Sequence, residues 1–253
     1  MQNSPPAPSG PPPPPQDDGL TPPRSPGPRM PPLGPACFAW SRHAAELAVP
    51  VSRALERWED TPTTARMVAD GYLVRLLPGI YVPPDVVGTA VGRALAVGSA
   101  LGTSLRPHHV LAGVTAAWVV LGGTAPVQVE LISTAHRGPI AGTIQRGARV
   151  AMDEVETVGG APLTIPDRTA MDLLRFSPDA ERLAAVSRLI AAGHASPEGI
   201  RRRLEAITHH PGSRSAQEAM DRACALVPVT DVGGGTRAAG GRHAPIAPGI
   251  SRG

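Results

Sequence analysis

Two arginines, Arg66 and Arg75, carry the chemistry that is most informative about function. An arginine can hold a phosphate through two hydrogen bonds or read the acceptors on the edge of guanine, so both are candidates for DNA contacts. Thr63 and Thr64 stand near the expected start of a helix, where hydroxyl and backbone N–H groups can donate to phosphates. The alternative is that the arginines only face solvent and the threonines only cap the helix.

The segment from Thr61 to Gly71 is expected to form the helix that presents Arg66. Thr61 can cap this helix, and Pro62 at its first position loses no hydrogen bond. Gly71 can take the left-handed conformation that ends a helix. The apolar residues fall on one face with helical spacing: Ala65, Val68 and Ala69.

A small hairpin is expected directly after this helix. Residues 72–77 and 80–82 are rich in β-branched, aromatic and aliphatic side chains, and the pair Pro78-Gly79 between them favours a turn. A helix followed by a hairpin is typical of a winged helix-turn-helix, whose recognition helix enters the major groove of DNA. We therefore expect residues 41–85 to form a DNA-binding unit.

The residues before the helix complete this expected unit. Residues 41–60 have helical periodicity that is interrupted near Pro50. Because proline removes a helical hydrogen bond, two short helices are predicted, the second with Leu55 and Trp58 on one face.

Residues 86–227 predict a second region of mixed α/β structure, in which Glu130 is expected to point outward from a strand. Arg168 and Asp172 are four residues apart on an expected helix, a spacing that suits an ion pair. The helices are expected at 86–97, 108–123, 168–176, 178–192 and 197–207, and the strands at 127–132 and around Val150, Val155 and Leu163.

Other residues that could do chemistry do not form a recognisable site in the sequence. Adjacent histidines occur at 108–109 and 209–210, but neighbouring side chains on a helix diverge, so we expect no metal site. No phosphate-binding loop, nucleophile motif or paired acid and base appears, so we expect neither a cofactor nor an enzyme. The two cysteines, Cys37 and Cys224, are expected to be unpaired thiols.

Composition gives only weak support for a nucleic-acid partner. All 24 basic residues are arginine, the formal net charge is +3, and the 31 prolines and 28 glycines suggest a GC-rich genome. No apolar run reaches the length of a membrane span and no signal pattern is present, so we expect a cytoplasmic protein with no membrane partner. The proline-rich residues 1–36 and the glycine-rich residues 228–253 are expected to be disordered tails.

Three stretches of the chain together resemble a known family. The segment 158–175 is similar to a signature of the AbiEi-type antitoxins, the transcriptional regulators of type IV toxin–antitoxin systems. In the hairpin, Gly79 and Tyr81 match the ending of the family's wing, and residues 108–123 look like its following apolar helix. The resemblance covers residues 41 to 225. The matching positions in 158–175 include Thr164, Pro166, Arg168, Thr169 and Asp172.

The resemblance implies an N-terminal winged helix-turn-helix at 41–85 that binds double-stranded operator DNA, followed by an antitoxin domain at 86–227. It also implies repression of the chain's own operon and neutralisation of a nucleotidyltransferase-like toxin. Residues 41–85 depart from the family because they contain only five arginines against six acids. Few cations predict few phosphate contacts, unless a homodimer or the cluster at 201–203 adds positive charge.

Two alternatives remain open from the sequence. Residues 213–227 are similar to the start of a Vsr-like endonuclease domain, with Glu218 and Arg222 on the motif. Such a nuclease needs further carboxylates to hold a metal, and none follows Asp231, so a truncated remnant without activity is expected. The other alternative is a degenerate protein-interaction module that no longer binds DNA.

Overall fold

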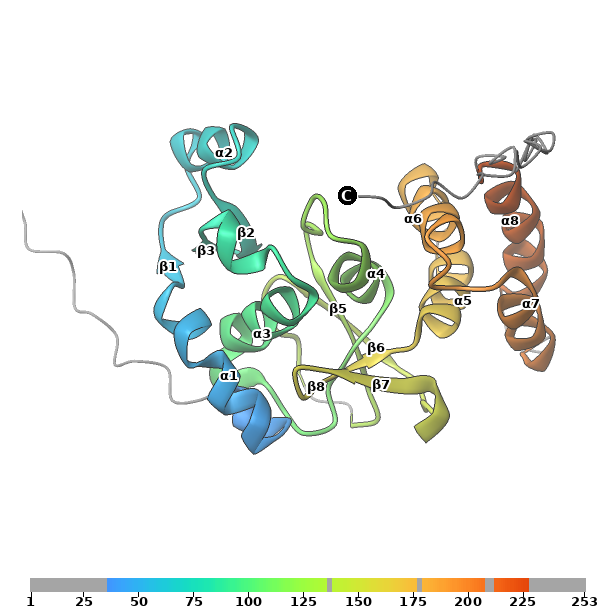
Figure 1. The fold of residues 1–253 in the computed structure, drawn as a ribbon, viewed down its shortest axis with the longest axis horizontal. Helices are drawn as coiled ribbons and strands as arrows, with labels where there is room; N and C mark the ends of the chain where they lie inside the picture. The colour runs from blue at the N-terminus through green and yellow to red at the C-terminus, as the bar shows by residue number, and fades with distance from the viewer. Residues whose placement is uncertain (1–35, 136–137, 177–178, 208–211, 228–253) are drawn as a thin grey trace, which may run out of the picture. The chain divides into compact units, whose positions relative to one another are not determined.

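The computed structural model describes residues 36–135, 138–176, 179–207 and 212–227. Within these ranges the chain forms eight α-helices and two β-sheets (Figure 1), so the expected mixed α/β fold class is confirmed. No helix in the described part is long and apolar enough to cross a membrane. The tails expected at 1–36 and 228–253 lie outside the described residues, apart from Ala36, which begins a short 3-10 helix, η1 (Ala36–Ala39).

The N-terminal elements surround a small antiparallel sheet whose strand order is β1-β3-β2. The hairpin expected after the 61–71 helix is confirmed, although its first strand begins at Val74 rather than Tyr72. The elements are α1 (Arg42–Arg53), β1 (Glu56–Arg57), α2 (Pro62–Ala69), β2 (Val74–Leu77) and β3 (Ile80–Val82).

The prediction of two short helices at 41–60 is wrong, because α1 runs through Pro50 without a break. Pro50 lies in the last turn of α1, so its missing N–H removes one bond near an end that is already closing. Burial of Ala44, Ala48 and Val51 in the core outweighs that loss. Residues 56–57 pair with β3 instead of forming a second helix. A strand therefore separates α1 from α2, where a helix-turn-helix has a short turn, and a winged helix-turn-helix is not confirmed.

A five-stranded mixed sheet with the order β6-β5-β4-β8-β7 forms the middle of the chain. The helix expected at 108–123 is wrong at its start, because residues 110–111 pair with both β5 and β8 and the helix begins only at Gly113. The helix expected at 86–97 is shifted to 90–101. The elements are η2 (Pro84–Val87), α3 (Ala90–Leu101), η3 (Gly102–Ser104), β4 (Val110–Leu111), α4 (Gly113–Leu121), β5 (Val129–Ser133), β6 (Thr143–Gly147), η4 (Met152–Glu154), β7 (Val155–Val158) and β8 (Ala161–Thr164).

One hydrophobic core joins the two sheets. Buried side chains of α1, β2 and β3 belong to the same cluster as those of α3, α4, β4, β5 and β8. Residues 41–85 therefore share their core with the elements that follow them. The domain boundary after residue 85 stays an expectation from the resemblance.

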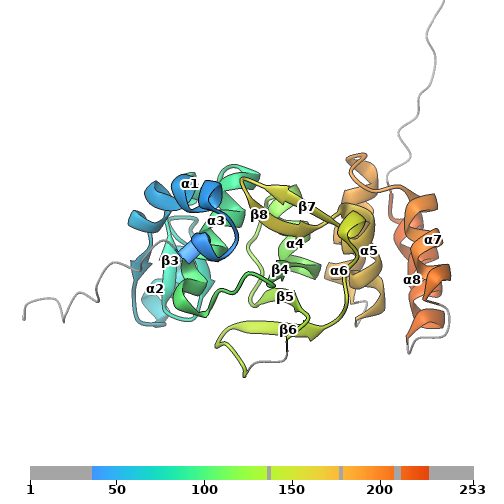
Figure 2. The same cartoon turned by 90° about the horizontal axis from the view of Figure 1, so that it is seen from below.

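Four helices lie together at the end of the described chain (Figure 2), and their buried side chains form a second core with Ala117 of α4. α5 packs against α4 and against the other three helices. The helices expected at 168–176, 178–192 and 197–207 are confirmed, and each of their ends lies within two residues of the expected position. Their bounds are α5 (Pro166–Arg175), α6 (Ala180–Ala191), α7 (Pro197–Ala206) and α8 (Ser213–Ala225).

Candidate nucleic-acid interface

α2 is the most exposed helix of the N-terminal region, since Thr64 is its only buried residue. Ala65 and Ala69, two of the three apolar residues that share one face by their spacing, are exposed. The helix ends as expected: Gly71 has a φ of 78°, and the backbone N–H groups of Tyr72 and Leu73 donate to the Met67 carbonyl. α2 is thus held mainly at its two ends, and most of its surface faces solvent.

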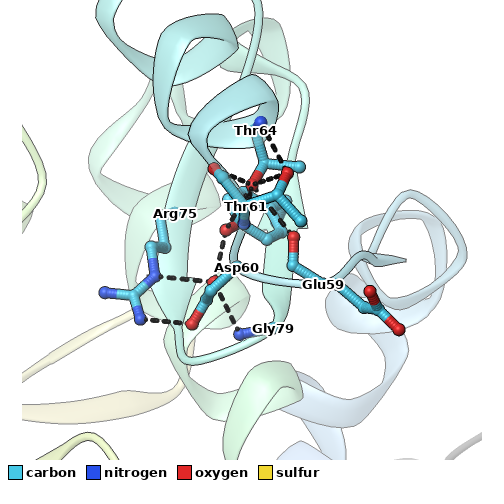
Figure 3. Close-up of polar contacts among 7 residues, drawn as sticks. Glu59, Asp60, Thr61, Thr64, Arg75 and Gly79 are labelled. Carbon is cyan, nitrogen blue, oxygen red and sulfur yellow. Dashed lines mark hydrogen bonds and ion pairs between the residues drawn. The ribbon is translucent and has the colours of Figure 1, made fainter.

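Asp60, just before α2, joins the helix to the hairpin (Figure 3). Its carboxylate accepts two hydrogen bonds from Arg75 on β2, Nε to Oδ1 at 3.2 Å and a terminal nitrogen to Oδ2 at 2.7 Å. The backbone N–H of Gly79 donates to Oδ1 at 3.2 Å, and so does the hydroxyl of Tyr81 on β3. One carboxylate therefore fixes the entry to α2 against both strands and the turn.

These contacts shift the charges at the junction. Hydrogen bonds from Arg75 and then Tyr81 hold the pKa of Asp60 well below its usual range, and Asp60 raises the pKa of Arg75. A carboxyl with a lowered pKa stabilises the folded state above its ordinary pKa and loses that contribution as pH falls through the lowered value. At neutral pH the junction is fully formed, and the positive charge of Arg75 is already balanced by Asp60.

The predicted DNA contacts Thr63, Thr64 and Arg66 differ in exposure. Thr64 is buried, and its hydroxyl accepts from the Thr61 N–H at 2.9 Å and donates to the Glu59 carbonyl at 2.9 Å. The Thr61 hydroxyl accepts from the Thr64 N–H, which completes a capping box. Thr64 therefore caps the helix from the interior, while Thr63 and Arg66 are exposed. The Arg66 side chain is 84% exposed and lies 3.7 Å from Asp70.

Substitution of Asp60 by asparagine is expected to loosen this junction. The change removes the charge from two hydrogen bonds with Arg75, so the melting temperature at pH 7 should fall and the Gly79 amide should exchange faster with solvent. Asp70→Asn is the matched control, because it removes the same charge from an exposed ion pair at the C-terminal end of α2. Thermal unfolding and hydrogen exchange measure both effects; equal behaviour of the two variants would rule out the special role of Asp60.

The family-motif residues at 164–172 lie in the interior around the start of α5. The Thr169 hydroxyl donates to the Thr164 carbonyl at 2.9 Å, and the two hydroxyls are 2.7 Å apart. Pro166 occupies the first turn of α5, as its missing N–H allows. Thr164 and Thr169 are fully buried, so they hold β8 to α5 rather than contact a ligand.

Arg168 and Asp172 form the expected pair on α5, with Nε and Oδ2 3.1 Å apart. The structure adds two partners that the sequence did not indicate: Glu154 binds Arg168, and also binds Arg203 of α7 at 2.9 Å. Burial raises the pKa of Asp172 to about 6, against the opposing effect of Arg168. This cluster ties η4, α5 and α7 together.

The raised pKa of Asp172 predicts a pH dependence of stability. Between its ordinary value of 3.8 and about 6, the folded chain holds a proton that the unfolded chain has released. The free energy of unfolding should therefore fall as pH rises from 4 to 6, by about 2 kcal/mol relative to Asp172→Asn. Urea denaturation across this range measures the difference, with the exposed Asp221→Asn as control. A constant difference between wild type and Asp172→Asn would contradict the assignment.

Glu130 is not outward-pointing, and that prediction is wrong. Its side chain is 2% exposed and pairs with Arg182 and, at 3.3 Å, with Arg146. Oε2 also accepts from the Val114 N–H in the first turn of α4. Every residue of β5 is buried, so a polar residue on this strand requires ionic partners from within the fold.

The remaining candidates have ordinary structural environments. Cys37 is buried beside Ser99, and burial raises the pKa of its thiol to about 11. His109 is buried, whereas the pair at 209–210 lies outside the described residues. Glu218 and Arg222 are exposed on α8. Within the part of the chain that is described, no three His, Cys, Asp or Glu side chains gather as a metal site requires.

No protein-family model matches the chain, and no curated protein is significantly similar to it. The resemblance to AbiEi-type antitoxins therefore stays a prediction that rests on the residues named above. Sequence inspection missed Asp60 and Glu154 and placed Glu130 wrongly. Each is a carboxylate whose arginine partners lie at least 14 positions away.

Proposed function

We propose that the chain is a DNA-binding transcriptional repressor that acts as the antitoxin of a type IV toxin–antitoxin pair. The observation that carries the DNA-binding half is the exposed helix α2, anchored by Asp60 to the hairpin and presenting Thr63 and Arg66 to solvent. A helix fixed at its base with a free outer face is suited to enter the major groove.

The size of the α2 side chains supports close approach to DNA. A helix with its side chains is about 10–12 Å across and the major groove is about 12 Å wide. Ala65 and Ala69 are exposed and small, so they allow the helix backbone to come near the base edges. Thr63 near the N-terminus and Arg66 one turn later would then face bases or phosphates.

Charge sets the expected mode of binding. Residues 41–85 contain five arginines and six acids, and Arg75 is balanced by Asp60. The arginines at 201–203 lie on α7, at the opposite end of the described unit from α2 in both views (Figures 1 and 2), so they do not extend the α2 surface. The affinity for DNA would therefore depend less on phosphate contacts than on base contacts. A homodimer would add a second copy of α2 and so double these base contacts.

The antitoxin half of the proposal rests on the resemblance of residues 158–175. The expected partner of the chain is a nucleotidyltransferase-like toxin. Co-expression of the chain with a toxin gene adjacent to its own gene would test this half of the proposal, with rescue of growth as the expected result. A neighbouring toxin that stays active in the presence of the chain would contradict this half alone.

An electrophoretic mobility shift with duplex DNA from upstream of the chain's own gene tests the DNA-binding half. Wild type should shift this duplex and leave a scrambled duplex of equal length unshifted. Arg66→Ala should weaken specific binding by about tenfold or more, the effect of losing one base or phosphate contact. Arg201→Ala, which removes the same charge far from α2, is the control and should change affinity by less than about twofold. Equal shifts of both duplexes would overturn the proposal.

A further inference from the structure

A groove of about 700 Å³ opens between the loop after β6, η4, α5 and α7. Its position is distinct from α2, because it is built from the second half of the chain. Arginines from three of these elements line it: Arg149, Arg168, Arg175, Arg202 and Arg203. Three acids also line it: Asp153, Glu154 and Asp167.

Two of the arginines are held in place by one carboxylate. Glu154 binds a terminal nitrogen of Arg168 from α5 through Oε2 and a terminal nitrogen of Arg203 from α7 through Oε1. A guanidinium group has five N–H donors, so these contacts leave donors on both side chains. The arrangement fixes two cations from different helices beside each other before any ligand arrives.

Two of the other arginines, Arg149 and Arg202, are not balanced by these acids. One Asp167 oxygen accepts the backbone N–H of Ser196 at 2.8 Å. Arg149 and Arg202 are exposed, and neither forms an ion pair with another described residue.

Apolar side chains provide a second kind of surface. Met171, Ala206 and Ile207 line the same groove. Its volume falls in the range of about 300–1,000 Å³ that is usual for small-molecule sites. Arginines suit a phosphate and the apolar patch suits a ring, and the volume fits one small molecule rather than a long nucleic-acid backbone.

We propose that this groove binds a small phosphorylated molecule of nucleotide size, with Arg149 and Arg202 as its phosphate contacts. The ligand supplies the anion that these two arginines lack within the described chain. The site is independent of the proposed repressor function, since neither arginine belongs to the α2 surface.

Calorimetric titration of the full chain with ATP, inorganic phosphate and a 20-nucleotide single-stranded DNA tests this proposal. ATP should bind and raise the melting temperature, because a ligand that binds only the folded state stabilises it. Inorganic phosphate should bind more weakly, because it has no ring to place on the apolar patch.

The double variant Arg149→Gln with Arg202→Gln should weaken ATP binding by about tenfold or more, since it removes two sets of charge-assisted hydrogen bonds to the phosphates. Arg201→Gln is the matched control: it is adjacent on α7, lines a different pocket and should change affinity by less than about twofold. Circular dichroism checks that the variants are folded.

Three outcomes would overturn the proposal: no heat or thermal shift with ATP at millimolar concentration, tighter binding of the oligonucleotide than of ATP, or equal weakening by the control. None of these measurements uses operator DNA, so a failure here is distinct from a failure of the repressor function.

Discussion

Replacing Glu130 with glutamine is expected to lower the free energy of unfolding by about 3–5 kcal/mol, the usual cost of removing one partner from a buried ionic cluster. The Glu130 side chain is 2% exposed, and those of its partners Arg182 and Arg146 are 12% and 24% exposed. Arg182 also lies 3.8 Å from Asp179, but that carboxylate is largely in solvent. Without the Glu130 charge, two mostly buried guanidinium groups lose their main counter-ion.

Urea denaturation of the Glu130→Gln variant measures this loss. Glu46→Gln is the matched control, because Glu46 also pairs with an arginine but the pair is exposed. An exposed pair contributes about 0–1 kcal/mol, so the control should be nearly as stable as wild type. A loss of under 1 kcal/mol for Glu130→Gln would show that the cluster does not depend on its charge.

Gly113→Ala is expected to destabilise the fold by about 4 kcal/mol or more, from two separate costs. Gly113 has a φ of 51°, a left-handed conformation that costs other residues about 1–2 kcal/mol. A Cβ at this position would also lie 1.6 Å from Oε2 of Glu130, so the carboxylate must leave its position. The second cost is the disruption of the same ionic cluster.

Two further variants separate these costs. Gly71→Ala has a similar φ of 78° but no atom within 4 Å of the new Cβ, so it should show only the conformational cost of about 1–2 kcal/mol. In a Glu130→Ala background the obstructing carboxylate is gone, and Gly113→Ala should again cost only about 1–2 kcal/mol. Full additivity of Gly113→Ala and Glu130→Ala would contradict the contact between them.

The parts of the fold that sequence predicts well are those fixed by local interactions. Thr61, Pro62 and Gly71 set the ends of α2 within the helix itself, and the structure confirms all three. The predictions are wrong where contacts with residues distant in the sequence determine whether a segment is helix or strand. α1 continues through Pro50 because its other face is buried in the core, and residues 110–111 form a strand because β5 and β8 lie beside them.

The same distinction applies to the candidate interface. Exposure of Arg66 and Thr63 follows from their helical positions, which the sequence provides. The role of Asp60 does not, because its partners Arg75, Gly79 and Tyr81 are 15 to 21 positions away. The outward direction expected for Glu130 assumed a strand with one face in solvent, but every residue of β5 is buried, so both faces of this strand are covered.

The most direct test of the account is the affinity for duplex DNA from upstream of the chain's own gene, measured by fluorescence anisotropy for wild type, Arg66→Ala and Asp70→Asn. If α2 is the DNA-binding helix, Arg66→Ala should weaken specific binding and Asp70→Asn should strengthen it, because the latter removes a negative charge 3.7 Å from Arg66. If both variants bind as wild type does, or if a scrambled duplex binds equally well, α2 is not a sequence-specific DNA-binding helix.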